Sequence, residues 1–162
     1  MLTLREITDL CTEAYGEAFD GAFGLLGPGV HVIGRSDGRI VSHAMWVARA
    51  LQCGTGRPLH TAYVEAVATR PTLQGRGFAT ALLRRLAQEI HDYDLGALSP
   101  SDDRFYRRLG WELWRGPLFI RTEDRLEATP DESVMILRTG LTPRELNLDG
   151  PLSAEWRPGE LW

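Results

Sequence analysis

A single carboxylate interrupts an apolar stretch near the middle of this 162-residue sequence. Glu65 lies between Ala62–Val64 and Ala66–Ala68, in a segment from Leu59 to Thr69 whose composition predicts a β-strand. Burying a carboxylate in such a strand is unfavourable unless the group is paired or functional. The apolar flanks make a glutamate that simply faces water the weaker interpretation. Glu65 is therefore a candidate general base, because a positioned carboxylate can remove a proton from a reacting group.

A glycine-rich turn follows this strand and leads directly into a long amphipathic helix. Gly75 and Gly77 allow the backbone to approach a ligand closely, and Arg76 adds a positive charge. The unpaired N–H groups and the dipole of the first helical turn attract anions. The spacing is not that of a P-loop, which needs Lys-Ser/Thr after the glycines, nor that of a dinucleotide fold, which needs a third glycine. The glycines alone would also fit an ordinary strand-to-helix turn.

A tyrosine on a later helix is the second candidate for acid–base chemistry. Ser101 can cap a helix that runs through Tyr106 and ends at Gly110. Phe105 and Leu109 are four residues apart and predict the core face of this helix, which would leave Tyr106 to point elsewhere. A phenol with a pKa of about 10 suits the protonation of a departing thiolate. Tyr106 is therefore a candidate general acid, and a packed core aromatic is the alternative.

Helical and strand-like segments alternate along the chain. We expect helices over Thr3–Ala18 and from Phe78 to Ile90, and a loop over Phe19–Gly29. The remaining strands are expected at Val30–Arg35 and Arg39–Val47, joined by the hairpin turn Ser36-Asp37-Gly38, and at Leu95–Leu98, Trp111–Arg121 and Val134–Arg138. This order predicts an α/β fold with a mixed sheet, and the length suits one domain spanning residues 1–162.

The charge pattern restricts the partners that the protein can have. The net charge is −4, and acids clearly outnumber arginines after Thr122. Such an acidic region argues against a nucleic-acid partner and would suit a cationic small molecule, although a solvated acidic surface is the simpler explanation. All 18 basic residues are arginines, so no lysine can take part in catalysis. No apolar run is long enough for a membrane helix, and the first residues lack a signal-peptide pattern, which predicts a cytoplasmic protein.

Cysteines and histidines show no pattern that indicates a metal site. Cys11 and Cys53 have neither metal-ligand spacing nor a disulfide framework. The histidines share no motif with one another, so we assign no metal and no catalytic role to His31, His43, His60 and His91.

The segment Gln74–Ala79 matches the Gln/Arg-x-x-Gly-x-Gly/Ala signature of the GNAT superfamily of N-acetyltransferases. A second segment, Arg104–Trp111, resembles the helix and turn that in this superfamily flank the thiol end of acetyl-CoA. The resemblance implies a GNAT-type mixed central sheet flanked by helices, with a first strand that is short or missing. It also implies that acetyl-CoA donates its acetyl group by direct attack of an amine, without an acyl-enzyme. The cofactor contacts implied are the backbone of Val67 and Thr69 for pantetheine, Ser99 near the thiol (a structural serine is the alternative), and, for the pyrophosphate, Gln74, Gly75, Arg76, Gly77, Phe78 and Ala79.

From about Ala14 to its last residue, the chain resembles the aminoglycoside 2′-N-acetyltransferases. The segments that carry this resemblance are Tyr63–Ala68, Leu95–Ser99, Leu109–Trp111, Trp114–Pro117, Thr129–Asp131 and Trp156–Trp162. It implies an aminoglycoside acceptor, a homodimer, and a Glu65 that acts through water on the substrate amine. The acceptor contacts implied are Glu17 or Asp20, Glu65, Asp131 or Glu132, Glu160, and the α-carboxylate and ring of Trp162. For each of these acids except Glu65, a plain surface position competes.

Two other functions fit parts of the sequence. A GNAT acetyltransferase for a peptide amine or a small metabolite amine would share the glycine-rich loop and differ in the acidic acceptor site. A catalytically weak acyl-CoA-binding module would also share the loop, but the presence of Glu65 and Tyr106 argues against it.

Overall fold

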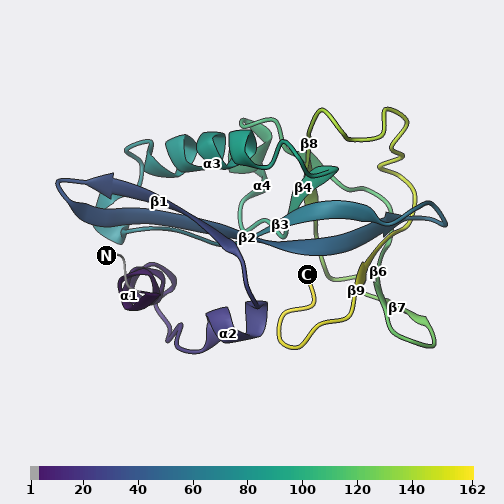
Figure 1. Ribbon diagram of the computed structural model, residues 1–162, viewed down its shortest axis with the longest axis horizontal. Coiled ribbons are helices and arrows are strands. Elements are labelled where there is room, and N and C mark those ends of the chain that lie inside the picture. Colours follow the sequence, from purple (N-terminus) through teal and green to yellow (C-terminus); the bar gives the residue numbers. More distant parts are fainter. Residues whose placement is uncertain (1–3) are drawn as a thin grey trace. The chain divides into compact units, whose positions relative to one another are not determined.

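The computed structural model describes residues 4–162, which form two compact units (Figure 1). Unit 1 comprises residues 4–47 and 64–89, and unit 2 comprises residues 48–63 and 90–162. The strands β2 (Arg39–Cys53) and β3 (Leu59–Thr69) each contribute residues to both units. The bounds of β3 are those predicted from its composition.

Unit 1 is built on a β-hairpin. Strand β1 (Val30–Ser36) pairs antiparallel with β2, in a register that runs from Val30 opposite Trp46 to Ser36 opposite Arg39. The two turn residues, Asp37 and Gly38, have φ angles of 50° and 77°. Two positive φ angles give the turn the twist of its flanking strands, which is why Asp-Gly is a strong hairpin signal. The predicted hairpin is therefore confirmed.

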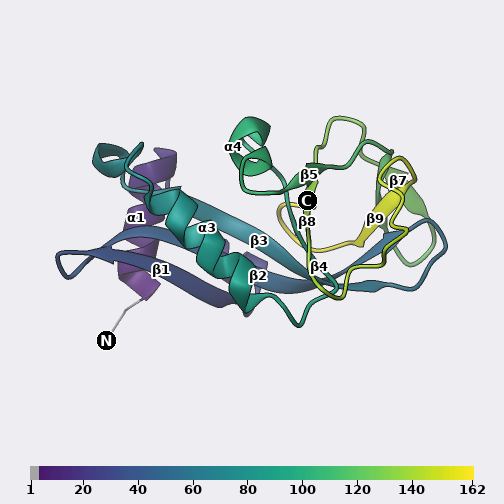
Figure 2. The ribbon, with the colours of Figure 1, turned by 90° about the horizontal axis from the view of Figure 1, so that it is seen from above.

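Helices cover both faces of the strands in unit 1. Helix α3 (Phe78–Glu89) packs against one face, and α1 (Leu4–Tyr15) and α2 (Ala22–Leu26) lie on the opposite face (Figures 1 and 2). The predicted first helix thus ends earlier than Ala18, and Thr3 lies outside the described residues. The prediction of a loop over Phe19–Gly29 is wrong in part, because Phe23 is buried and holds a short helix within that segment.

Unit 2 contains the parallel part of the sheet. Strand β4 (Leu95–Leu98) runs parallel to the start of β3, with Thr61 opposite Leu95. Strand β8 (Met135–Arg138) pairs antiparallel with β4, and β5 (Glu112–Leu113) pairs with β8. All four residues of β4 are buried, as expected for a short strand with neighbours on both sides. Helix α4 (Asp103–Arg107) follows β4.

A second group of strands completes unit 2. Strand β6 (Leu118–Arg121) runs parallel to β9 (Leu152–Glu155) and antiparallel to β7 (Leu126–Ala128), and β9 pairs with the end of β2. The prediction of one strand over Trp111–Arg121 is wrong, since a break separates β5 from β6. At this break Gly116 crosses the backbone of Gly150 so closely that a Cβ would lie 1.9 Å from its carbonyl oxygen.

The hydrogen-bonded strand order is β5-β8-β4-β3-β2-β9-β6-β7, with β1 also paired to β2. Parallel and antiparallel pairs both occur in it, so the predicted mixed α/β fold is confirmed. No strand precedes α1 within the described residues, and none of the helices in residues 4–162 is long and apolar enough to cross a membrane.

We predict that the two units unfold in one cooperative transition, because β2 and β3 are shared between them. Far-UV circular dichroism reports chiefly on α1 and α3 of unit 1, whereas all tryptophans except Trp46 lie in unit 2. Urea curves followed by the two signals should therefore have the same midpoint. Separated midpoints would show that the chain holds two domains rather than one.

Candidate active site

Strand β3 is distorted next to the candidate base. Ala66 has a φ angle of 52°, a left-handed conformation that costs a residue other than glycine about 1–2 kcal/mol. Residues 61–64 of the strand are all buried, whereas Glu65, Ala66 and Val67 are all half-buried. A local irregularity of this kind re-aims a side chain. Glu65 is thus neither enclosed in the core nor placed on an ordinary strand surface.

Two histidines, a buried His43 and a half-buried His31, meet beside this distortion. The Nδ1 of His43 lies 2.8 Å from the carbonyl oxygen of Ala66, and its Nε2 lies 2.8 Å from Nδ1 of His31. The absence of a motif common to the histidines therefore did not indicate this pair, which the fold brings together. The hairpin brings them together. Ile33 on β1 lies opposite His43 on β2, and His31, two residues before Ile33, is on the same face of β1 and is therefore a diagonal neighbour of His43. The register shift between Gly34 and Arg35 is required for this, because the predicted turn extended without it would place the two histidines on opposite faces.

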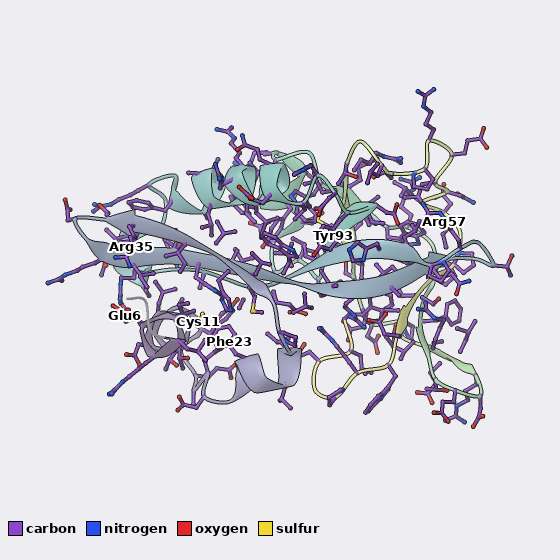
Figure 3. All side chains as sticks on the ribbon, in the orientation of Figure 1. Glu6, Cys11, Phe23, Arg35, Arg57 and Tyr93 are labelled. Carbon is purple, nitrogen blue, oxygen red and sulfur yellow. The ribbon has the colours of Figure 1, made fainter. Side chains whose placement is uncertain are left out.

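Apolar residues from the two N-terminal helices surround this histidine pair. The ring of Phe23 lies edge-on to both imidazoles, with centroids 5.6 Å and 5.8 Å away, and the Sγ of Cys11 lies 3.8 Å from Nδ1 of His43. Figure 3 labels Cys11 on α1 and Phe23 on α2. Burial lowers the pKa of His43 to about 4 and also lowers the pKa of His31, so both are neutral at pH 7. Burial raises the pKa of Cys11 to about 12, which fits the absence of a nucleophilic role.

The strand expected to hold pantetheine is already contacted by the first helix. The hydroxyl of Tyr15 donates a 2.9 Å hydrogen bond to the carbonyl of Val67. A carbonyl oxygen has two lone pairs, so this contact leaves a second acceptor position on Val67. At the end of the strand, the buried hydroxyl of Thr69 has no hydrogen-bond partner within the described part of the chain, and the carbonyl of Thr69 accepts from Gln74 Nε2 at 3.3 Å.

The glycine-rich loop has the backbone that its sequence predicts. A short 3₁₀ turn, η1 (Pro71–Leu73), leads into it, and Gly75 and Gly77 have φ angles of 76° and 86°. No described heavy atom lies within 4 Å of where a Cβ on either glycine would sit, so their φ angles, rather than lack of space, require glycine. Residues 74–77 are exposed, and Phe78 and Ala79 are half-buried at the start of α3. The first N–H groups of α3 have no partner inside the helix, and the loop can therefore accept a diphosphate.

Arg70 fixes the start of this loop against the rest of unit 1. Its backbone N–H donates to the carbonyl of Val41 at 2.9 Å, and its Nε donates to the carbonyl of Ile40 at 2.9 Å. Its guanidinium also pairs with Glu13 of α1. The start of the loop is thus held in place. The loop therefore has fewer conformations to lose when a phosphate binds to it.

The candidate acid, Tyr106, is buried on α4. Its ring packs edge-on against Phe105 and Trp111, with centroids 5.2 Å and 6.0 Å away. The predicted core face of this helix is wrong, because Phe105 and Leu109 are half-buried whereas Tyr106 is 6% exposed. Burial, and then the charge of Asp102, raises the pKa of Tyr106 to about 12. The phenol is therefore protonated at neutral pH, and it is a weaker acid than the free side chain considered above.

The elements around α4 differ slightly from those predicted. The helix cap is Asp102, whose side chain accepts a 3.0 Å hydrogen bond from the N–H of Arg104, and Ser101 does not take this role. An aspartate at this position also places a negative charge at the N-terminus of the helix, where it is favourable. Ser99 follows the last residue of β4 and is exposed.

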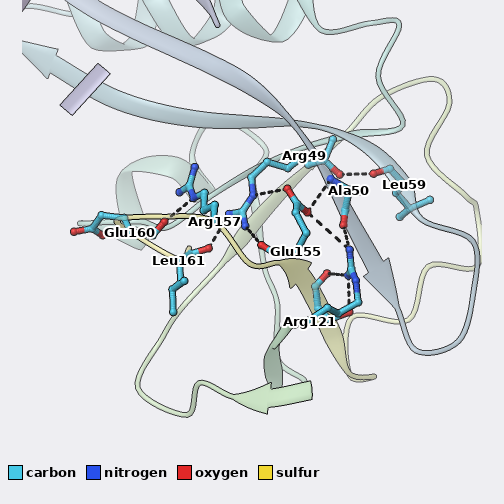
Figure 4. Close-up of polar contacts among 10 residues, drawn as sticks. Arg49, Ala50, Leu59, Arg121, Glu155, Arg157, Glu160 and Leu161 are labelled. Atoms are coloured by element: carbon cyan, nitrogen blue, oxygen red, sulfur yellow. Dashed lines mark hydrogen bonds and ion pairs between the residues drawn. The ribbon is translucent and has the colours of Figure 1, made fainter. Parts of the chain in front are cut away.

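A buried arginine clamps the last residues of the described chain (Figure 4). The guanidinium of Arg49 donates to Oε1 of Glu155 at 3.1 Å, to the carbonyl of Glu155 at 2.7 Å and to the carbonyl of Leu161 at 2.8 Å. It also lies over the ring of Tyr63, 4.8 Å from the centroid. Sequence reasoning missed Arg49, because its partners are more than 100 residues away along the chain. A buried charge of this kind is tolerable only when its hydrogen bonds are made.

The C-terminal segment 156–162 also binds the turn that follows β7. The indole N–H of Trp162 donates to the hydroxyl of Thr129 at 2.9 Å, and Trp162 is 3% exposed. Two segments that carried the family resemblance, Thr129–Asp131 and Trp156–Trp162, are thereby brought together. The segment is therefore tied down. The burial of the indole argues against the contact between the ring of Trp162 and the acceptor that the resemblance implies.

Apart from the half-buried Glu65, the acids implied for the acceptor site are exposed, and they lie in both units. Glu17 and Asp20 lie between α1 and α2 in unit 1. In unit 2, Asp131 and Glu132 follow β7, and Glu160 lies in the clamped C-terminal segment, where its carbonyl accepts from Arg157. Within residues 4–162, no group of three or more histidine, cysteine, aspartate or glutamate side chains could hold a metal ion.

Comparison with known proteins agrees with this arrangement. Residues 4–114 match the family described as the acetyltransferase (GNAT) domain. The chain is 35% identical, over 165 aligned residues, to an aminoglycoside 2′-N-acetyltransferase from Mycolicibacterium fortuitum, and the match covers 90% of this chain and 80% of the relative.

Solved structures share the fold at low identity. The GNAT family N-acetyltransferase YhbS from Escherichia coli, crystallised in complex with CoA, matches with a TM-score of 0.67 and 16% identity over 97% of this chain and 87% of that one. A GCN5-related N-acetyltransferase from Kribbella flavida matches with a TM-score of 0.61 and 23% identity over 70% of this chain. The match covers only 31% of the Kribbella structure, so the chain spans less than a third of its length.

We predict that Gly77→Ala weakens the binding of coenzyme A about tenfold. Holding alanine at a φ near 86° costs about 1–2 kcal/mol, so the loop of the free variant will adopt another conformation. Binding of coenzyme A must then restore the original conformation, and the cost lowers the affinity. Isothermal titration calorimetry with coenzyme A measures the change. Gly140→Ala is the matched control, since Gly140 has no positive φ and no described atom within 4 Å of its Cβ position. Equal affinity of both variants would show that the loop conformation is unimportant for binding.

Proposed function

The chain belongs to the GNAT family of acetyltransferases and is an acetyl-CoA-dependent N-acetyltransferase, and we propose that its acceptor is the 2′-amine of an aminoglycoside. The observation that carries the proposal is the extent of the similarity to the mycobacterial enzyme. The GNAT domain match ends at residue 114, whereas the match to that relative covers 90% of the chain and so continues into the segments that follow. Those segments include the turn at Thr129.

We assign the cofactor contacts to unit 1 and the end of β4. The backbone of Val67 and Thr69 would hold the pantetheine arm, and Gln74–Ala79 would hold the pyrophosphate. The observations in support are the exposed loop, the two positive φ angles and the unpaired N–H groups at the start of α3. Ser99 would lie near the thiol.

Each candidate acid–base residue has one proposed step. Glu65, acting through water, removes the proton from the acceptor amine, which then attacks the acetyl group directly. Tyr106 donates its proton to the sulfur as the thiol leaves, and its raised pKa keeps that proton in place at neutral pH until then. Neither cysteine takes part in this scheme.

The proposed acceptor site depends on several carboxylates acting together. A single exposed ion pair contributes only about 0–1 kcal/mol, so one acid cannot select a polycation. We assign this task to Glu17 or Asp20, Asp131 or Glu132, Glu65 and Glu160, with Trp162 as the anchor of the segment that carries Glu160. A homodimer follows from the same family resemblance, and it remains a prediction together with the cytoplasmic location expected from the sequence.

Regiospecificity tests the proposed acceptor. An aminoglycoside with a 2′-amine should be acetylated, and its analogue with a 2′-hydroxyl should not, because only the amine can be deprotonated and attack at that position. The release of free thiol from acetyl-CoA measures turnover, and a peptide with a free amino terminus serves as a third acceptor. Equal turnover of both aminoglycosides would remove the 2′ assignment, and turnover of the peptide alone would favour a peptide acetyltransferase.

We further predict that Arg49→Lys raises the KM for the aminoglycoside about tenfold while the KM for acetyl-CoA stays the same. Lysine keeps the charge but cannot reproduce the planar fork that binds Glu155 and Leu161 together, so the C-terminal segment is released. Arg115→Lys is the control, because Arg115 makes an exposed ion pair with Asp149 in the same unit. If both variants leave the aminoglycoside KM unchanged, the clamped segment is not part of the acceptor site.

A further inference from the structure

The hydrogen bonds of the histidine pair are fixed in direction. The carbonyl of Ala66 can only accept, so Nδ1 of His43 must carry a proton and donate it. Since His43 is neutral, its Nε2 then has a lone pair and must accept from Nδ1 of His31. The two imidazoles and the carbonyl thus form one chain of donors and acceptors that runs from β1, through β2, to β3.

This series of hydrogen bonds ends at the Ala66–Val67 peptide, whose conformation is unfavourable without a partner for its carbonyl. The left-handed φ of Ala66 is unfavourable for an alanine, and its carbonyl is met by a side chain, the imidazole of His43. The hydrogen bond from His43 satisfies that carbonyl in a half-buried position. If it were lost, the Ala66–Val67 peptide could rotate toward regular strand geometry, and the side chain of Glu65 would change direction with it.

Simple core filling does not require histidine at these positions. His43 is fully buried, and an aliphatic side chain of similar volume would avoid the cost of burying two polar ring nitrogens. The groups that face the pair, Phe23 and the protonated thiol of Cys11, bring no charge that would call for an imidazole. What the pair supplies is a donor aimed at the carbonyl of Ala66.

We propose that His43 and His31 are positioning residues that hold the Ala66 carbonyl and thereby set the direction of the Glu65 carboxylate. His43 makes the contact, and His31 fixes the tautomer and the ring orientation of His43. The proposal rests on the proposed role of Glu65 as the base.

Asparagine and leucine at position 43 test the proposal, because their side chains have the same shape. In His43→Asn the amide nitrogen can take the place of Nδ1 and donate to Ala66, whereas His43→Leu has no donor. Displacement of a catalytic group by about 1 Å can cost about 10²-fold. With acetyl-CoA and an aminoglycoside that carries a 2′-amine, we expect His43→Leu to lower kcat about 10- to 100-fold at an unchanged KM for acetyl-CoA. His43→Asn should keep most of the activity, and Cys11→Ala, which alters the same pocket without removing a donor to Ala66, should behave like the wild type.

The Glu65→Gln background separates positioning from general stability. If His43 acts through Glu65, His43→Leu should cause no further loss of kcat once Glu65 is replaced. Two losses that multiply would overturn the proposal, as would equal activity of the leucine and asparagine variants. A Glu65→Gln protein with full activity would instead overturn both the assignment of the base and the role of the pair that depends on it.

A readout without substrate keeps the test independent of the acceptor. The amide of Val67 belongs to the peptide whose carbonyl His43 holds, so its hydrogen exchange should be faster in His43→Leu than in the wild type and in His43→Asn. If the wild type acetylates no aminoglycoside, the proposed acceptor is wrong. Faster exchange confined to His43→Leu would still support the proposal that His43 holds the Ala66 carbonyl. Equal exchange in all three proteins would overturn it.

Discussion

The left-handed backbone at Ala66 is the constraint on which the candidate active site depends. A regular strand would direct Glu65 either into the core or onto the strand surface, and it would return each carbonyl to a neighbouring strand. The distortion prevents both outcomes, and it leaves one carbonyl that needs a new partner. His43 is that partner, and the second histidine and the apolar residues from α1 and α2 are arranged around it. A short stretch of unfavourable backbone therefore accounts for residues on four other elements, β1, β2, α1 and α2.

Strand β3 has a structural part before Ala66 and a part available to a ligand after it. Before Ala66, β3 pairs in parallel with β4 and is buried on both faces, as suits a structural strand. After Ala66 it runs through Val67 and Thr69 to the glycine-rich loop, where polar atoms are left for a ligand. The change from one part to the other takes place within a few residues of the positive φ angle at Ala66.

Charge is handled differently in the interior and on the surface of unit 2. Arg49 is buried, and each of its nitrogens has an acceptor on Glu155 or Leu161, so its desolvation is offset by hydrogen bonds. Asp131, Glu132 and Glu160 are exposed and remain solvated. Exposed carboxylates cost little to maintain and can be desolvated when a cationic ligand arrives, whereas the buried arginine holds the segment on which one of them lies.

The sequence determined the elements whose signals are local. The Asp-Gly turn, the strands β3 and β4, helix α3 and the glycine loop could all be predicted, since turn chemistry and periodicity act over a few residues. The GNAT signature lies in one of these local segments, which is why the family could be identified from it. The tertiary structure alone decided which face of α4 is buried, where the strand after Trp111 breaks, and that β7 and β9 form at all. It also decided that His31 meets His43 and that Arg49 holds Glu155. These contacts join residues that are 12 and 106 positions apart, and their energies depend on burial and strand pairing, which no local pattern of residues specifies.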